Sequence, residues 1–276
     1  DQAEKIARAI FGDKSSQLAK IYLSRGEVYS SKSQDDKAEE CYKQAFDIRT
    51  SLGEQKSRDL ANCYDALAYK YIGESSKAIE YLSKALKIRK EIFLGDNHVE
   101  IALSYELLGD NFVFMEKYDE SLEWYTKALN VINKLLGECY HYANTCGKIA
   151  SAYNHKGNLN LAVEWAKKDL DTKVRCLTEK NLEVAECYSN LGAIYAIHNQ
   201  YNKAIDSFQH ALSIAQSILG NTHGKIVTLL FKIGHMYHNA KNNKEANEYY
   251  EKGLLSMISE IKSNPLSILE SDAYVA

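Results

Sequence analysis

The chain has 276 residues, of which 45% are hydrophobic and 26% are charged, a balance that is ordinary for a soluble folded protein and excludes a predominantly disordered chain. Acidic and basic residues are interspersed and the net charge is −3, so the sequence offers no basic stripe for the phosphates of a nucleic acid. Pro265 is the single proline, against 20 tyrosines, and runs rich in Val and Thr do not recur. These features predict an all-α protein that does not bind nucleic acid.

The sequence also bears on location. No apolar run approaches the roughly 20 residues that span a bilayer, and the first residues, Asp1 to Glu4, lack the basic and then apolar pattern of a signal peptide. The six cysteines accompany no Asn-x-Ser/Thr glycosylation site, which favours free thiols in a reducing compartment over disulfides. We therefore expect a cytoplasmic protein without membrane insertion and without a cofactor.

The first predicted element is a short helix over residues 4–12. Its sequence is similar to the end of the second helices described below, where each of them enters a linker. We therefore expect residues 1–14 to be the end of a preceding repeat, and the chain to be a monomeric fragment of a longer protein.

Six helical hairpins follow, and a repeated spacing of small and aromatic residues marks each of them. A small residue recurs at intervals of 40 to 43 residues, a ring follows it by three residues, and a second small residue follows it by twelve. This spacing predicts two antiparallel helices whose backbones approach to roughly 8–10 Å, with the ring filling the space beside them. The first small residues are Gly26, Ala66, Gly109, Ala150, Gly192 and Gly234, and the rings are Tyr29, Tyr69, Phe112, Tyr153, Tyr195 and Tyr237.

The second helix of most hairpins carries a large apolar residue and a small residue, four and seven positions after its own first small residue, as at Tyr125 and Ala128. Steps of three and four keep such residues on one face of a helix. The fourth hairpin departs from this pattern, because Ala166 and Asp169 stand at these positions. We therefore expect its second helix to pack less tightly than the others.

These residues resemble the tetratricopeptide repeat, and the pattern runs from about Ser15 to Lys262. The repeat exceeds the usual length of about 34 residues, and several second helices end in Leu-Gly before a polar linker, as in Leu94-Gly95-Asp96-Asn97-His98. In both respects the chain resembles the kinesin light chain subclass, although no proline follows the histidine here. The resemblance implies one right-handed α-α superhelix (TPR solenoid) over residues 1–276, with repeats at about 15–54, 55–97, 98–138, 139–180, 181–222 and 223–262.

Residues 263–276 follow the last hairpin. Pro265 ends the last predicted helix, and we expect Leu266 to Ala276 to form a short cap over the apolar face of the terminal repeat. The alternative is that Glu270 to Val275, which look like a tyrosine-acidic cargo motif, occupy a groove.

The resemblance also implies where a ligand binds, because the first helices of such a solenoid line a shared concave groove. We expect apolar side chains of the second and third hairpins to anchor a partner, and asparagines of the fourth and fifth to bond with an extended backbone. The alternative for each apolar residue is burial against the adjoining hairpin. The predicted groove residues are Leu67, Lys70, Tyr71, Leu103, Glu106, Asp110, Val113, Phe114, Asn144, Ser151, Asn154, His155, Glu186, Asn190, Ile197, Phe231 and His235.

Sequence motifs for catalysis are missing. The chain contains no Gly-rich phosphate loop, Gly-x-Ser-x-Gly elbow or His-Glu-x-x-His helix, so we do not expect an enzyme. His235 and His238 share one helical face, but two imidazoles are too few for a metal site. Cys139, His141 and Cys146 do not have a recognised zinc spacing, so we expect no metal there either.

The function that these features predict is protein binding. We expect a module that binds a peptide segment of a partner protein as an adaptor or scaffold, and a cargo adaptor similar to kinesin light chains is one form of it. One alternative is a regulatory sensor or self-assembling scaffold domain of a larger signalling protein. Another is a spacer without a ligand in its groove.

Overall fold

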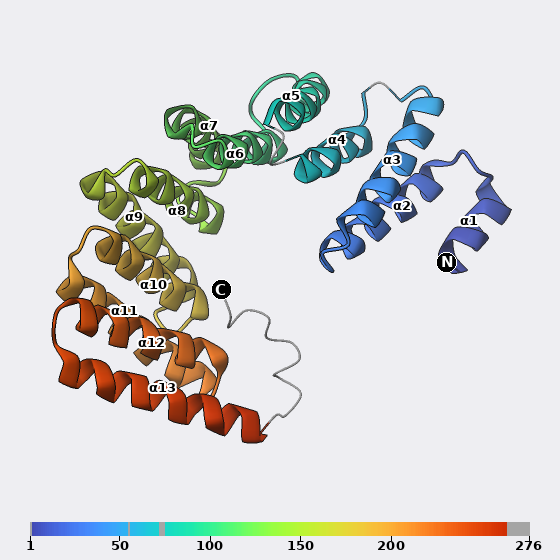
Figure 1. Ribbon diagram of the computed structural model, residues 1–276. Coiled ribbons are helices and arrows are strands. Elements are labelled where there is room, and N and C mark those ends of the chain that lie inside the picture. The colour runs from blue at the N-terminus through green and yellow to red at the C-terminus, as the bar shows by residue number, and fades with distance from the viewer. Residues whose placement is uncertain (1, 55, 72–74, 264–276) are drawn as a thin grey trace. The chain divides into compact units, whose positions relative to one another are not determined.

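Figure 1 shows the computed structural model of the chain, which describes residues 2–54, 56–71 and 75–263. Within these residues the chain forms thirteen α-helices and no strand, which confirms the prediction of an all-α fold. The chain divides into two compact units, Asp1–Gly137 and Glu138–Ala276. Each unit is a succession of antiparallel helix pairs, and each is described by itself.

The first unit contains one single helix and three hairpins. Each first helix lies against its own second helix and against the helix that precedes it: α2 against α1, α4 against α3, and α6 against α5. The helices are α1 (Gln2–Phe11), α2 (Ser16–Ser30), α3 (Asp35–Ser51), α4 (Arg58–Lys70), α5 (Ser75–Ile92), α6 (Val99–Phe114) and α7 (Tyr118–Leu136).

The second unit contains three hairpins that pack in the same way, with α10 against α9 and α12 against α11. Its helices are α8 (Tyr140–His155), α9 (Leu159–Leu177), α10 (Leu182–Ile197), α11 (Tyr201–Leu219), α12 (Gly224–Asn239) and α13 (Asn243–Ser263). The predicted six hairpins with a helix ahead of them are thus confirmed. The predicted cap and the tyrosine-acidic motif, in residues 264–276, lie outside the described residues.

A glycine beneath a ring joins the two helices of most hairpins. A Cβ atom added to Gly26 would stand 2.3 Å from the ring of Tyr42, and one added to Gly109 would stand 2.5 Å from the ring of Tyr125. The fifth and sixth hairpins repeat this arrangement with other residues in the same places. The glycine lets the second helix approach closely, as the spacing predicts, but the ring over the glycine belongs to the second helix, sixteen residues later, and is not the predicted ring three residues after the glycine.

The second hairpin corrects the predicted register by two residues. Ala68 is buried whereas Tyr69 is 63% exposed, so Ala66 and Tyr69 are not the packing pair, and Ala68 and Tyr71 take their places. The physical reason is the length of the first helix, since α4 has 13 residues whereas α6 has 16. The small residue therefore stands ten positions before Ala78 instead of twelve.

The fourth hairpin corrects the expectation of loose packing. Ala166 and Asp169 of α9 are both buried. Asp169 lies 3.2 Å from the Nζ of Lys173 and accepts a hydrogen bond from the Sγ of Cys187 at 3.3 Å. A Cβ atom at Gly147 of α8 would meet the Asp169 carboxylate at 2.9 Å. The carboxylate therefore fills the space beside a glycine, and burial raises its pKa.

Histidines of the linkers cap the helices that follow them. The Nδ1 atom of His98 accepts a hydrogen bond from the backbone N–H of Glu100 at 3.2 Å, and that of His223 accepts one from Lys225 at 3.1 Å. Asn181 caps α10 through its side-chain oxygen in the same way. A side-chain acceptor satisfies one of the free N–H groups of a helix start. This role explains why a histidine ends the linker before α6 and the linker before α12.

Candidate functional site: the surfaces of the first helices

The candidate binding surfaces are the exposed side chains of the first helices in each unit. We call them the unit 1 surface, on α2, α4 and α6, and the unit 2 surface, on α8, α10 and α12. The predicted groove residues are divided between the two compact units, so each surface carries its own set.

Helix α6 carries the apolar part of the unit 1 surface. Leu103 and Phe114 are exposed, the latter to 64%, while Glu106, Asp110 and Val113 are half-buried. Their spacing of three, four, three and one residues places them on one face of the helix. The structure thus brings five predicted residues together in one stripe, with an apolar side chain at each end.

Asp110 also has a structural role. Its carboxylate accepts a hydrogen bond from the hydroxyl of Tyr125 in α7 at 2.6 Å. Burial, together with this carboxylate, raises the pKa of Tyr125. Because Tyr125 is the ring over Gly109, Asp110 stabilises the packing of the third hairpin. A ligand could bond only with the lone pairs of Asp110 that Tyr125 does not use.

The second hairpin contributes other residues than predicted. Leu67 is only 3% exposed and packs with Ala38 and Tyr42, so its assignment to a groove is wrong. Tyr71 is a packing ring, 5.9 Å from the ring of Tyr81. The side chain of Lys70 lies outside the described residues, and only its backbone, the last residue of α4, is placed.

Tyr69 is the member of the unit 1 surface that the sequence analysis missed. Its side chain is among the most exposed of the large hydrophobic residues. The two-residue correction places Tyr69 one position after the small residue of its helix, where Asp110 stands in α6. The correct register could have been found from the pair Leu67-Ala68, which matches Leu191-Gly192 of α10.

On the unit 2 surface, α8 presents polar residues. Ser151 and His155 are exposed, and Asn144 and Asn154 are half-buried. The Nδ1 atom of His155 lies 2.8 Å from the carbonyl oxygen of Ser151, so the imidazole lies along its own helix. Among the described residues the Oδ1 atom of Asn154 has no hydrogen-bond partner although it is shielded from water. Because an atom that water cannot reach is not open to a ligand either, Asn154 would bind a ligand N–H only after its side chain rotates.

Helix α10 presents Glu186, Asn190 and Ile197, all exposed and separated by four and seven residues. On α12 the exposed His235 lies 3.4 Å from the Nδ2 atom of Asn239. Phe231 departs from the prediction, because its ring packs on α13 next to Gly253 and 6.1 Å from the ring of Tyr250. Phe231 is therefore mainly a packing residue.

Lys232 is the second residue that the sequence analysis missed. Its Nζ atom donates to the Oγ of Ser189 at 3.3 Å and so links α12 to α10. The side chain is exposed overall, but its ammonium lies 5.6 Å from the centre of the Phe208 ring, and the partial desolvation lowers its pKa. The unit 2 surface thus carries the ammonium of Lys232, the carboxylate of Glu186 and two imidazoles, whereas Glu106 and Asp110 make the α6 stripe of the unit 1 surface acidic.

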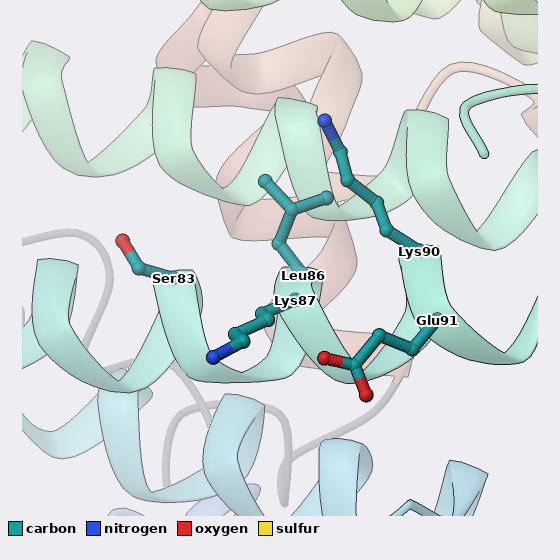
Figure 2. A pocket seen from close by; sticks show the side chains of 5 residues that line it. All are labelled: Ser83, Leu86, Lys87, Lys90 and Glu91. Carbon is teal, nitrogen blue, oxygen red and sulfur yellow. The ribbon is translucent and has the colours of Figure 1, made fainter. Parts of the chain in front are cut away.

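Other possible sites lie elsewhere or are not formed. A hollow on α5 is lined by Ser83, Leu86, Lys87, Lys90 and Glu91, which all come from that one helix (Figure 2). It does not belong to either first-helix surface. Among the described residues no three His, Cys, Asp or Glu side chains lie close enough to hold a metal ion. None of the described helices has the length and apolar character needed to cross a membrane.

The fold and the repeated glycine-ring contact define a protein built from tandem helical hairpins. Its sequence matches the tetratricopeptide repeat over residues 17–91, 64–134, 141–217 and 199–254. The chain therefore belongs to the tetratricopeptide repeat family.

Its relatives include proteins similar to kinesin light chains. The chain is 22% identical over 240 residues to Protein KINESIN LIGHT CHAIN-RELATED 1 of Arabidopsis thaliana, a match that covers 71% of this chain and 39% of that protein. It is 27% identical over 152 residues to the transcriptional activator NprA of Geobacillus stearothermophilus, covering 55% of this chain and 36% of NprA. The chain thus spans about two fifths of the length of these relatives.

Solved structures show the same fold. BtubC (BKLC) from P. vanneervenii is 18% identical with a TM-score of 0.65, and the match covers 94% of this chain and 92% of BtubC. A putative kinesin light chain from Podosopora anserina with nearly identical TPR-like repeats is also 18% identical, with a TM-score of 0.64, over 76% of this chain and 99% of that one. The chain thus resembles kinesin light chain-like repeat proteins in both sequence and fold.

Proposed function

We propose that the chain is a protein-interaction module whose first-helix surfaces bind a peptide segment of a partner protein, as an adaptor or scaffold. The stripe on α6 carries this proposal, because Leu103 and Phe114 expose apolar side chains at both ends of it. An exposed ring adds little to the stability of a monomer, whereas such side chains anchor binding partners. Tyr69 of α4 adds a second exposed ring to the unit 1 surface.

The unit 2 surface, taken by itself, suits an extended polar segment. Asn144, Asn154 and Asn190 each offer an amide that both donates and accepts, which fits the backbone of an extended peptide. The ammonium of Lys232 favours an acidic group in the part of the segment that lies near α12, because opposite charge steers and orients a partner. We propose that the chain binds a partner and is not an enzyme. We also propose that it acts in the cytoplasm, as its free cysteines suggest.

The test uses a peptide library displayed on phage and selected against the whole chain. Selected peptides are then measured by fluorescence anisotropy against Phe114→Ser, Asn190→Ala and the combined variant with Asn154→Ala. Loss of an anchoring side chain should weaken binding by about tenfold or more.

Leu94→Ser is the matched control. Among the residues that the structure describes, Leu94 is the most exposed large hydrophobic one, and it lies in the linker between α5 and α6, so its loss should leave affinity unchanged. Equal affinities for the folded triple variant and the unaltered chain would overturn the proposal. Circular dichroism of each variant shows that the helices are retained.

A second candidate is a regulatory sensor or self-assembling scaffold domain of a larger signalling protein. Its support is the similarity to NprA, a transcriptional activator, and the exposed apolar side chains Ile6 and Ile10 on α1. Light scattering distinguishes the two candidates. A chain that stays monomeric at high concentration and binds the selected peptides argues against self-assembly.

A further inference from the structure

His98 caps the start of α6 through an atom that can bind a proton. Its Nδ1 atom accepts the hydrogen bond from the backbone N–H of Glu100 at 3.2 Å. An imidazole nitrogen accepts such a bond only while it carries no proton, because both ring nitrogens of a charged histidine are donors. A histidine side chain changes charge between about pH 5 and 8. A helix cap made by histidine therefore depends on pH in this range, whereas one made by serine or asparagine does not.

A ring stack holds the His98 imidazole in place. The imidazole lies flat on the ring of Phe93, with 3.5 Å between the ring centres and 5° between the planes. The guanidinium of Arg58 in α4 lies 5.0 Å from the centre of the same Phe93 ring. A charged imidazole would therefore add a second cation to a ring that already has one. The stack orients His98 for capping without favouring its protonated form.

Glu100, the acidic residue at the start of α6, already has two cationic partners. Its carboxylate lies 3.0 Å from the Nη2 atom of Arg58 and 3.7 Å from the Nε atom of Arg89 in α5. The positive end of the helix dipole also lies here and disfavours a further cation. Glu100 is therefore not an uncompensated charge that waits for a proton on His98.

The linker before α6 is balanced in the same way. The carboxylate of Asp96 lies 2.9 Å from the Nζ atom of Lys90, and this hydrogen bond lowers the pKa of Asp96. From α7, the ammonium of Lys134 donates a hydrogen bond to Asn97 at 3.1 Å. A proton on His98 would thus bring a further positive charge to a place where the cations already match the carboxylates.

The first turns of α6 join this helix to α5. Ile101 and Ala102, which follow the capped turn, are completely buried. The Nη1 atom of Arg89 in α5 donates a hydrogen bond to the Oγ atom of Ser104 at 2.9 Å. Fraying of the helix start would loosen these residues first, because a helix without its cap opens from the end.

We propose that His98 is a proton-operated switch at the junction of α5 and α6. At neutral and higher pH its imidazole is uncharged and holds the first turn of α6. As the pH falls, protonation breaks the bond to Glu100 and releases this turn from α5. Because α6 carries the stripe from Leu103 to Phe114, acid should also weaken peptide binding there, a consequence that rests on the proposed function.

The second unit provides two comparisons for this switch. Helix α10 is capped by the side-chain oxygen of Asn181, which accepts from the N–H of Glu183 at 2.8 Å and does not titrate. Helix α12 begins after His223, but there the carboxylate of Glu260 also accepts a hydrogen bond, from the N–H of Gly224 at 3.0 Å. This carboxylate satisfies the helix start when the imidazole does not. We therefore expect no response to mild acid in α10 and a weaker response in α12 than in α6.

Hydrogen exchange of the whole chain, followed for single amides by NMR, tests the switch. With rates corrected for the intrinsic effect of pH, protection of the amides from Glu100 to Ala102 should fall about fivefold between about pH 7.5 and about pH 5.5. His98→Asn supplies the kind of cap that α10 has and should keep the protection at both pH values. His98→Ala should show the low protection at both. His223→Asn is the matched control and should leave the response of α6 unchanged.

Three results would overturn the switch. They are equal protection of these amides at the two pH values, a fall that persists in His98→Asn, and a His98→Ala variant that is as protected at neutral pH as the unaltered chain. The exchange experiment contains no ligand, so its outcome does not depend on the proposed function. A chain that shows the expected exchange but binds no selected peptide would contradict the proposed function and leave the switch standing.

Discussion

Phe208 lies over Gly192 so closely that a Cβ atom on the glycine would stand 2.8 Å from two carbons of the ring. Both residues are buried, and α10 and α11 meet at this point. Gly192→Ala should therefore destabilise the second unit by about 1–3 kcal/mol through overpacking, measured by urea denaturation. Phe208→Leu should make the same alanine less costly, as a double-mutant cycle shows. Additive effects of the two substitutions would contradict the contact.

The corrected register of the second hairpin predicts opposite effects for two neighbouring residues. Leu67→Ala removes a buried side chain and should cost about 2–5 kcal/mol of the free energy of unfolding. Tyr69→Ala removes an exposed one and should change it by less than about 0.5 kcal/mol. Chemical denaturation of both variants checks this. A larger loss for Tyr69→Ala would restore the register of Ala66 and Tyr69.

The buried pair of the fourth hairpin predicts a rescue. Lys173→Met leaves Asp169 buried without its cation, and breaking a buried pair from one side costs about 3–5 kcal/mol. Asp169→Ala together with Lys173→Ile copies Ala128 and Ile132 of the third hairpin, and this double variant should be close to the unaltered chain in stability. If thermal denaturation shows the double variant to be as unstable as Lys173→Met, the pair is not replaceable by apolar packing.

The contact between α1 and α2 predicts a dependence on pH. Hydrogen bonds from Tyr22 and Arg25 lower the pKa of Glu4 from 4.5 to about 2. Since the folded pKa is depressed, the contact stabilises fully above pH 4.5 and loses this effect as the pH falls toward about 2. Glu4→Gln should lower the Tm at neutral pH. The loss in the free energy of unfolding should be less than about 1 kcal/mol, because the carboxylate is partly solvated.

The difference in Tm between Glu4→Gln and the unaltered chain should shrink as the pH falls below 4.5. Lys5→Gln serves as the control, since Lys5 is an exposed residue of the same helix. A difference in Tm that stays constant between neutral pH and pH 3 would show that Glu4 does not hold α1 through its charge.

The cysteines should differ in reactivity. Burial raises the pKa of Cys63 to about 11 and those of Cys146 and Cys187 to about 12, so their thiols stay protonated and unreactive. Cys176 is exposed. Iodoacetamide should therefore label Cys176 first, and Cys63, Cys146 and Cys187 only after unfolding in urea. Rapid labelling of Cys187 in the folded chain would show that α9 and α10 separate readily.

The helical hairpins could be predicted from the sequence because their packing depends on a local pattern. A small residue and a ring at fixed distances are sufficient to align antiparallel helices, and four glycines with rings sixteen residues later repeat this arrangement. The second hairpin was ambiguous because Ala66 and Ala68 are both small and Tyr69 and Tyr71 are both rings. Only the length of α4 decides between the two registers, and no residue of the pattern specifies that length.

The binding surface was harder to predict than the fold. The stripe from Leu103 to Phe114 could be identified because one helix contains it, so periodicity alone orders its residues. The prediction for Leu67 was wrong because it relied on the wrong register of the second hairpin. The prediction for Phe231 was wrong because Gly253 of α13 leaves space for its ring. Lys232 was missed because its contacts with Ser189 and Phe208 join helices that are far apart in the sequence.

Phe114, His155 and Ile197 stand at the same position of three successive hairpins, five residues after the small residue of each first helix, and all three are exposed. One is aromatic, one is an imidazole and one is aliphatic, yet the helices around them keep the same lengths and contacts. Because they are exposed, exchanges of side chains at this position should cost little stability. Evolution, or a protein engineer, can alter ligand preference here one hairpin at a time while the scaffold stays as it is.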